Sequence, residues 1–325
     1  MARINRILSL IAVTVASLAV TVDAQVDMMM TNYVEALNYY NAAAIGTSDY
    51  LRVRVGGRWD RIGADPAPKS FMLTGDMPLP LLGNKLAAGV VAQRESIGLY
   101  RNITAGLQCG YKITTGRSSS VTLAVQAGII DNEFRWSERE LPESDAASDE
   151  AGDIPIEDQR HSAMDLSLGA FYNSRHFWAG VSVTHLTRSQ VTLDVDGDGD
   201  NAVAFNAGRK FYLMVGGNIP IKNTLFEIQP SMLLRADRAR VTGQLTARVR
   251  YNRFLWAGVA WRHDDAVALL LGAEFSNIFI GYSYDRVVAD VSRRGRGSHE
   301  VWGGYKVKLD FGPRNRYGHK SIRIM

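Results

Sequence analysis

The amino-acid sequence predicts an all-β protein: a transmembrane antiparallel β-barrel of about fourteen strands, with short periplasmic turns and long external loops. Three observations predict this fold. Hydrophobicity alternates with a period of two residues, the alternating segments are long, and short and long links follow one another between them. A soluble β-sandwich would need neither this strict rhythm of links nor a chain so rich in tyrosine and tryptophan.

The first 24 residues have the layout of a secretory signal peptide. Arg3 and Arg6 form a basic start, and residues 7–22 carry no charge. Val22-Asp23-Ala24 then offers small residues for cleavage. The alternative is an N-terminal membrane anchor, but the uncharged run is shorter than the roughly 20 residues of a membrane span. Further along the chain no apolar run reaches about 18 residues, which excludes a helical membrane protein.

The segment Leu99–Ile113 shows the alternation best. Its odd positions are apolar apart from Arg101, and its even positions are polar or small. Side chains alternate across a strand, so this segment has one apolar and one polar face. It is much longer than the usual globular strand of about 5–6 residues, and it fits a tilted strand that crosses a bilayer.

Similar runs along the chain give the strand count. They start near Tyr50, Ser70, Lys85, Leu99, Ser119, Ser162, Phe177, Lys210, Leu225, Gln244, Leu255, Val267, Ile278 and His299. An even number is typical of a bacterial single-chain barrel.

The links between these runs differ in length. We predict short ones at Gly116–Ser118, Asn173–His176, Pro220–Thr224, Asn252–Phe254 and Ser276–Asn277. Long ones are predicted at Asn132–His161, Thr187–Arg209, Ala236–Gly243 and Arg286–Ser298. This layout places the short turns in the periplasm and the long loops outside the cell. Four tryptophans are candidates for an interfacial aromatic girdle, with ordinary core positions as the alternative: Trp59, Trp178, Trp256 and Trp302.

The order of several motifs resembles the PorP/SprF family of type IX secretion outer-membrane proteins. Asn41-Ala-Ala-Ala-Ile-Gly46 stands where that family carries an N-P-A-Y-A-G-like motif, with Ala42 and Ala44 in place of Pro and Tyr. The other matching segments are Arg58-Trp59, Asp65–Ser70, Lys85–Gly98, Gln126–Gly128, Trp178–Leu186, Pro230–Leu234, Leu255–Arg262, Ile280–Asp285 and Gly297–Glu300. Their shared order extends over roughly residues 30–310.

The resemblance implies a non-enzymatic secretion component. Such a barrel would dock other machinery components, or secreted and surface proteins such as gliding adhesins, for export or retention. The family has no known catalytic residues to carry over. The alternative function is an outer-membrane diffusion or transport barrel for small or hydrophobic molecules. The sequence does not name the cargo, the partner subunit or the stoichiometry.

Composition excludes other classes of protein. Cys109 is the only cysteine, so an intramolecular disulfide, a Cys-based zinc site and an iron–sulfur cluster are excluded. The formal charge of +4 is too small to indicate nucleic acid as a partner. No cofactor is expected, except calcium if the acidic motif described next binds it.

The exception is an acidic motif. Asp194, Asp196 and Asp198, followed by Gly199 and Asp200, match the first half of a calcium-binding loop. Carboxylates on alternate residues can converge on one cation, but the expected bidentate glutamate is missing and no helices flank the motif. The sequence leaves open a calcium site or a solvated acidic loop.

Two further loops carry dense charge. Glu133–Asp158 contains ten acids and two bases, which is typical of a mobile external loop that repels or selects partners, or simply keeps the surface soluble. Arg293, Arg294 and Arg296 lie in the last long loop. They are candidates for docking an acidic partner or lipopolysaccharide phosphates, with a plain exposed basic loop as the alternative.

A hydrolase site is not supported. Ser298, His299 and Glu300 have the residue types of a catalytic triad, but neighbouring residues on a strand point to opposite faces. The remaining histidines show no metal-binding spacing. We therefore expect no enzyme activity.

The chain divides into four parts. After the signal peptide (1–24), residues 25–48 contain methionines and tyrosines that seldom stay exposed, so we expect a plug that packs inside the barrel or against its periplasmic mouth; a disordered leader is the alternative. Residues 49–311 form the barrel, and residues 312–325 form a basic tail. The expected location is the cell outer membrane.

Overall fold

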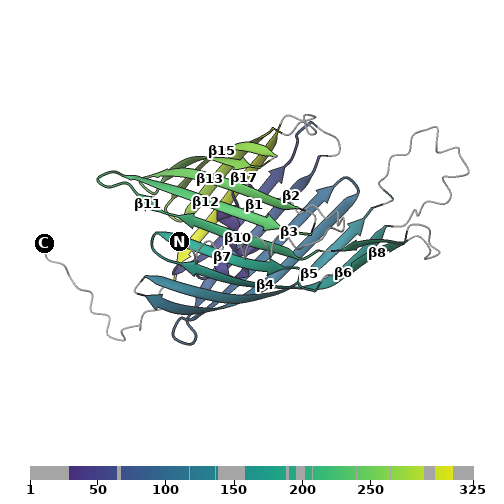
Figure 1. The fold of residues 1–325 in the computed structure, drawn as a ribbon, viewed down its shortest axis with the longest axis horizontal. Coiled ribbons are helices and arrows are strands. Elements are labelled where there is room, and N and C mark those ends of the chain that lie inside the picture. The colour runs from purple at the N-terminus through teal and green to yellow at the C-terminus, as the bar shows by residue number, and fades with distance from the viewer. Residues whose placement is uncertain are drawn as a thin grey trace, which may run out of the picture.

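The protein folds as a closed antiparallel β-barrel, seen in a computed structural model (Figure 1). The structure describes residues 29–63, 67–116, 118–135, 137, 158–187, 190–194, 202–206, 208–238, 240–263, 265–288 and 297–309. The barrel strands are β1 (Tyr50–Trp59), β2 (Lys69–Leu79), β3 (Leu86–Ile97), β4 (Tyr100–Gly116), β5 (Ser119–Phe134), β6 (Gln159–Asn173), β7 (Phe177–Thr184), β10 (Lys210–Gly217), β12 (Phe226–Ala236), β13 (Val241–Tyr251), β14 (Leu255–Arg262), β15 (Ala266–Phe275), β16 (Ile278–Val287) and β17 (Ser298–Lys308).

Each barrel strand pairs with its neighbour along the chain. The ring closes where β1 pairs with β17, so that Tyr50 lies opposite Lys308. β7 pairs directly with β10, the next barrel strand, and β10 then pairs with β12. The fourteen predicted strands are confirmed, and every predicted start lies within three residues of the observed one.

A few elements lie outside the ring. β8 (Gln190–Asp194) and β9 (Ala202–Asn206) form a separate hairpin, which the sequence reading did not predict. β11 (Ile219–Pro220) adds two residues beside β12. The described residues before β1 form the 3₁₀ helices η1 (Tyr33–Ala36) and η2 (Ala42–Ala44) and, between them, the short α-helix α2 (Leu37–Tyr40). Within the described ranges, no helix is long and apolar enough to cross a membrane.

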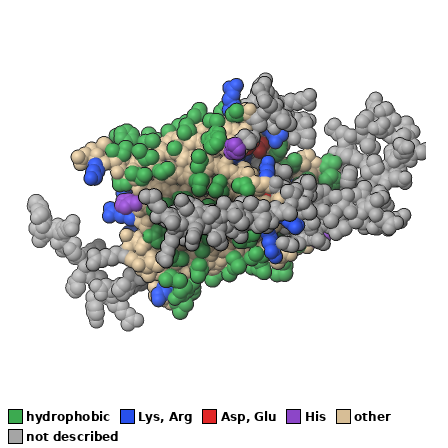
Figure 2. Space-filling view, in the orientation of Figure 1, with side chains coloured by type: hydrophobic (Ala, Val, Ile, Leu, Met, Phe, Trp, Pro, Cys, Tyr) green, Lys and Arg blue, Asp and Glu red, His purple; other side chains and the backbone are tan. Residues whose placement is uncertain are grey.

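The two faces of the wall are as different as the alternation predicts. Leu107 on β4 is 72% exposed, whereas its neighbour Gln108 is 3% exposed. Figure 2 shows hydrophobic side chains spread over the outer wall, with Lys and Arg side chains toward the ends. An apolar exterior around a closed ladder is what a bilayer requires, because no strand edge is left unpaired in lipid. Cys109 is exposed on this outer face.

The two ends of the barrel differ. At the end where β1 starts and β17 finishes, which we call the turn end, links such as Ser276–Asn277 are short. The opposite, loop end carries the long links after β5, β7 and β16. In Figure 1 the label β11 marks the turn end and β8 the loop end. One predicted long loop is wrong: β12 stops at Ala236 and β13 starts at Val241, because the alternation continues almost to the turn.

The predicted tryptophan girdle is wrong for three of its four members. Trp178, Trp256 and Trp302 occupy inward positions, and Trp256 and Trp302 are buried. Each indole ring lies over a glycine of a neighbouring strand, such as Gly56 under Trp302. A bare glycine leaves room for a flat ring, which restores packing that the strand would otherwise lack. Trp59 alone of the four lies at an outward position, edge-on to Phe71.

Candidate functional site

Residues 29–48, the described part of the predicted N-terminal region, lie inside the bore of the barrel. We call them the bore segment. Met30, Tyr33 and Ile45 have no exposed surface. The partners of the segment come from strands around most of the ring, including β2, β4, β6, β7, β13, β14, β16 and β17.

The segment runs along the bore from the loop end to the turn end. Thr31 bonds to inward residues near the loop-end tips of β1 and β16, Arg58 and Asp285. Gly46 instead donates its backbone N–H to Asp76, three residues before the turn end of β2. The barrel is therefore occupied over much of its length by the chain's own N-terminal region.

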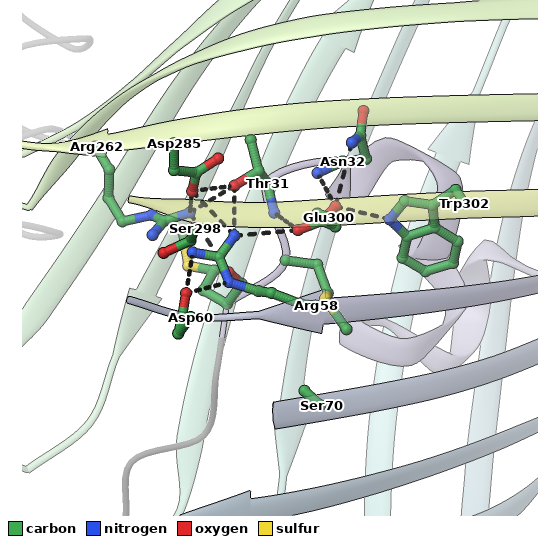
Figure 3. A network of polar contacts seen from close by, with 12 residues as sticks. Thr31, Asn32, Arg58, Asp60, Ser70, Arg262, Asp285, Ser298, Glu300 and Trp302 are labelled. Carbon is green, nitrogen blue, oxygen red and sulfur yellow. Dashed lines mark hydrogen bonds and ion pairs between the residues drawn. The ribbon is translucent and has the colours of Figure 1, made fainter. Parts of the chain in front are cut away.

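A buried polar network holds the start of the segment (Figure 3). The Glu300 carboxylate accepts the backbone N–H groups of Thr31 at 2.7 Å and Asn32 at 2.8 Å. The same carboxylate accepts Trp302 Nε1 at 2.7 Å and lies 3.1 Å from Arg58 Nη1. Glu300 thus satisfies two backbone donors that an isolated 3₁₀ turn would leave unpaired.

Arg58 joins the segment to two strands at once. Its Nη1 donates to Thr31 Oγ1 at 2.8 Å and to Asp285 Oδ2 at 2.9 Å. Its Nε donates to Asp60 at 2.8 Å. Thr31 Oγ1 in turn donates to Asp285 at 2.6 Å. Charges this deeply buried are tolerated only when they are paired and hydrogen-bonded, and here the bore segment supplies part of the pairing.

Arg262 and Gln244 complete the network from β14 and β13. Arg262 Nη2 donates to Thr31 Oγ1 at 3.1 Å and to Gln244 Oε1 at 3.0 Å. Gln244 Nε2 donates to the Thr31 carbonyl at 2.8 Å. We name Thr31, Asn32, Arg58, Gln244, Arg262, Asp285 and Glu300 the loop-end network.

A second ionic contact lies midway along the segment. Glu35 of η1 lies 2.9 Å from Arg248 and 3.2 Å from Arg54. Burial alone would raise the pKa of Glu35, but the two guanidinium groups hold it below its usual value. Glu35 is therefore ionised at neutral pH and compensates charge on both arginines.

Asn41 fixes the middle of the segment to β6 and β7. Its Nδ2 donates to the carbonyls of Ala170 at 3.1 Å and Val181 at 3.2 Å, while its Oδ1 accepts from Ala43 and caps η2. The side chain reaches these strands because Gly169 and Gly180 lie beneath it, and a Cβ at either position would collide with it.

The end of the segment lies on glycines of other strands. The Ile45 side chain packs over Gly89 and Gly110. A Cβ added at Gly89 would lie 2.7 Å from Ile45, and one added at Gly110 would lie 3.2 Å from it. Gly46 has a φ of +58°, a conformation that glycine adopts without strain. Asn41, Ala43 and Gly46 keep the family pattern N-P-A-Y-A-G. Each has a defined structural role, since Ala43 N–H is the donor that Asn41 Oδ1 caps.

The predicted binding loops fall mostly outside the described residues. Asp194 ends β8, whereas Asp196, Asp198 and Asp200 lie outside the described ranges. Arg293, Arg294 and Arg296 also lie outside them. Among the described side chains, no group of three His, Cys, Asp or Glu residues could hold a metal ion. The calcium site and the basic docking loop stay predictions.

The Ser298–Glu300 motif is structural in the described barrel. Ser298 and Glu300 are buried at inward positions, and His299 lies between them with its ring near Tyr282 and Tyr284. Because His299 lies on the opposite face of the strand from Ser298 and Glu300, the three side chains do not meet, as the sequence predicts. The sequence reading missed the role of Glu300, although a charged residue on the inward face of a strand was the available signal.

Comparison with known proteins identifies the family. The profile described as "Type IX secretion system membrane protein PorP/SprF" matches residues 22–305. A search of curated proteins finds no match.

Solved outer-membrane barrels are similar to the chain at low sequence identity. Acinetobacter baumannii Omp33 is 10% identical with a TM-score of 0.44, over 80% of this chain and 99% of that one. A Pseudomonas aeruginosa FadL homologue is 12% identical with a TM-score of 0.46, over 81% and 90% of the two chains. The Pseudomonas putida toluene transporter TodX is 11% identical with a TM-score of 0.44, over 89% and 95%.

The family match covers most of the chain, includes Asn41–Gly46 and the strand motifs around Glu300, and agrees with a closed barrel whose outer wall is apolar. The chain belongs to the PorP/SprF family of type IX secretion system membrane proteins.

Proposed function

We propose that the protein is a non-enzymatic outer-membrane component of the type IX secretion system that docks machinery subunits or cargo. It would thereby serve export or surface retention of specific proteins, gliding adhesins among them. Family membership and the apolar outer wall support the location, since barrels of this kind are built for outer membranes.

The observation that carries the proposal is the anchored bore segment. A diffusion barrel needs a continuous lumen, whereas here residues 29–48 are tied to the wall by buried hydrogen bonds of Thr31 and by ion pairs such as Glu35–Arg248. Removing these residues from the bore would leave Arg58 and Asp285 without part of their hydrogen-bonding shell. An occupied bore favours a rigid docking body over a transport path.

A genetic experiment tests this function. Deletion of the gene should abolish surface appearance of a secreted adhesin, measured with an antibody on intact cells. The rate of small-solute permeation across the outer membrane should stay unchanged. Reintroduced wild-type protein, purified in mild detergent, should retain type IX components detectable by mass spectrometry. Unchanged surface display together with slower solute uptake would contradict docking and favour the transport alternative.

A further inference from the structure

A cavity of about 300 Å³ lies in the bore between the bore segment and the turn-end rim. Glu35 and Asn38 of the bore segment line it on one side, and Asn218 and Asn277 near the short turns line it at the rim. We call it the turn-end socket. Its volume is at the lower limit of ligand-binding pockets, which run from about 300 to 1,000 Å³.

The socket carries an excess of positive charge. Among the described residues, five cationic side chains line it, namely Arg52, Arg54, Arg248, Arg250 and Lys306. The described carboxylates that face them are the three of Glu35, Asp76 and Glu274. The difference of five cations and three anions is a formal charge of +2 in a partly enclosed space, where water screens charge less than at an open surface.

The excess is distributed over two clusters. Glu35 is shared between Arg54 and Arg248, so one carboxylate faces two guanidinium groups. The Nε of Arg248 is buried and donates no hydrogen bond to any described residue. This cluster therefore has one positive charge more than its carboxylate balances, and the buried Arg248 Nε–H is left without an acceptor among the described residues.

The second cluster lies at the rim and also has two cationic side chains around one carboxylate. Glu274 lies 2.6 Å from Arg250 and also pairs with Lys306. Within the described residues the Nε of Arg250 is again buried without a hydrogen-bond acceptor. In contrast, Asp76 is matched one to one by Arg52, at 2.6 Å. Both surplus charges thus belong to clusters that could receive one more carboxylate each.

The rest of the lining suits a peptide. Trp178 stacks on Phe171 with ring centroids 5.9 Å apart, and Trp256 stacks on Phe279 at 6.3 Å. Carboxamides of Asn38, Asn173, Asn218, Gln229 and Asn277 also line the space. Carboxamides can donate to and accept from a peptide backbone, and flat aromatic pairs offer apolar contact to side chains.

We propose that the turn-end socket binds an acidic peptide segment of a periplasmic protein partner, whose carboxylates pair with the clusters around Glu35 and Glu274. The inference rests on the proposed docking function, because it names the chemistry by which a machinery subunit would be recognised. Guanidinium groups hold carboxylates in charge-assisted hydrogen bonds, which are the stronger class.

Peptide binding to the full mature chain in nanodiscs tests the proposal. The probe is the fluorescein-labelled peptide Ser-Gly-Asp-Glu-Asp with a free carboxyl terminus, and fluorescence anisotropy gives its affinity. The matched peptide Ser-Gly-Asn-Gln-Asn with an amidated terminus should bind about tenfold or more weakly, the effect of losing a charge-assisted hydrogen bond. Raising salt should weaken binding of the acidic peptide.

Variants locate the binding site. The double variant Arg54→Gln, Arg250→Gln should lose affinity by about tenfold or more. Both side chains are partly exposed, at 24% and 22%, so this change disturbs the fold less than a substitution in the loop-end network. Arg253→Gln is the matched control, because Arg253 is on the same rim but 81% exposed and outside the socket lining. If the double variant does not fold, Lys306→Gln alone serves in its place.

The outcomes separate this proposal from the docking function. Equal affinity for both peptides, or equal loss in Arg253→Gln, overturns the acidic-peptide site. Complete displacement of the peptide by millimolar inorganic phosphate, with phosphate binding lost in the same variants, means a small-anion site and also overturns it. In either case loss of adhesin display on gene deletion would leave the docking function standing.

Discussion

Glu300→Ala is expected to release the bore segment from the barrel. Glu300 is fully buried and accepts the backbone N–H groups of Thr31 and Asn32 together with Trp302 Nε1. Its removal leaves the Arg58 charge with less compensation in a buried site. Breaking a buried ion pair by removing one partner costs about 3–5 kcal/mol. The strand ladders do not depend on this carboxylate, so we expect the segment to leave while the barrel stays closed.

Limited proteolysis of the reconstituted protein measures this release. Cleavage within residues 29–48 should become at least tenfold faster in Glu300→Ala, while the β-sheet circular dichroism signal stays unchanged. Glu133→Ala is the matched control, because Glu133 is on a strand of the same barrel but is partly exposed and pairs with Arg135. Protection equal to wild type would show that Glu300 does not hold the segment.

Gly169→Ala is expected to displace the segment at its second attachment. A Cβ at this position would overlap Asn41 Oδ1, so the asparagine must move. Moving it breaks the hydrogen bonds from Asn41 Nδ2 to Ala170 and Val181 and uncaps η2. Overpacking of a filled interior costs about 1–3 kcal/mol, and the lost hydrogen bonds add about 1 kcal/mol each.

Samples heated to increasing temperatures are run on a denaturing gel, where a folded barrel migrates faster than the unfolded chain. The temperature at which the fast, folded band disappears should be lower for Gly169→Ala than for wild type. Gly303→Ala is the control: it is also a strand glycine, but a Cβ there meets no atom within 4 Å. A Gly169→Ala barrel as stable and as protease-resistant as Gly303→Ala would contradict the packing of Asn41 against β6.

The strand layout could be predicted from sequence because side-chain alternation is a local property. Leu99–Ile113 has its apolar residues outward and its polar residues inward, because successive side chains of a strand point to opposite faces. The predicted link Ala236–Gly243 is longer than the observed one, because β13 already starts at Val241. The first residues of β13 include Thr242 and Gly243, and polar and small residues next to a turn resemble a loop in sequence. The β8–β9 hairpin lies in a loop and belongs to no barrel pattern.

The contacts that hold the bore segment could not be predicted in this way. Glu300 and Thr31 are 269 residues apart in sequence, and their meeting depends on closure of the whole ring. The inward tryptophans were missed for a related reason. Whether Trp302 faces inward depends on Gly56 of the neighbouring strand, not on its own neighbours in sequence. The local signs of an occupied bore were the methionines and tyrosines of residues 25–48 and the charge of Glu300 at an inward position of its strand.

The most direct test of an occupied bore is the conductance of the wild-type mature chain in planar bilayers. An anchored segment predicts no stable open channel for wild type and for Glu133→Ala, but frequent opening for Glu300→Ala. A steady ionic current through the wild-type barrel, unchanged by Glu300→Ala, would contradict the account and favour a transport barrel.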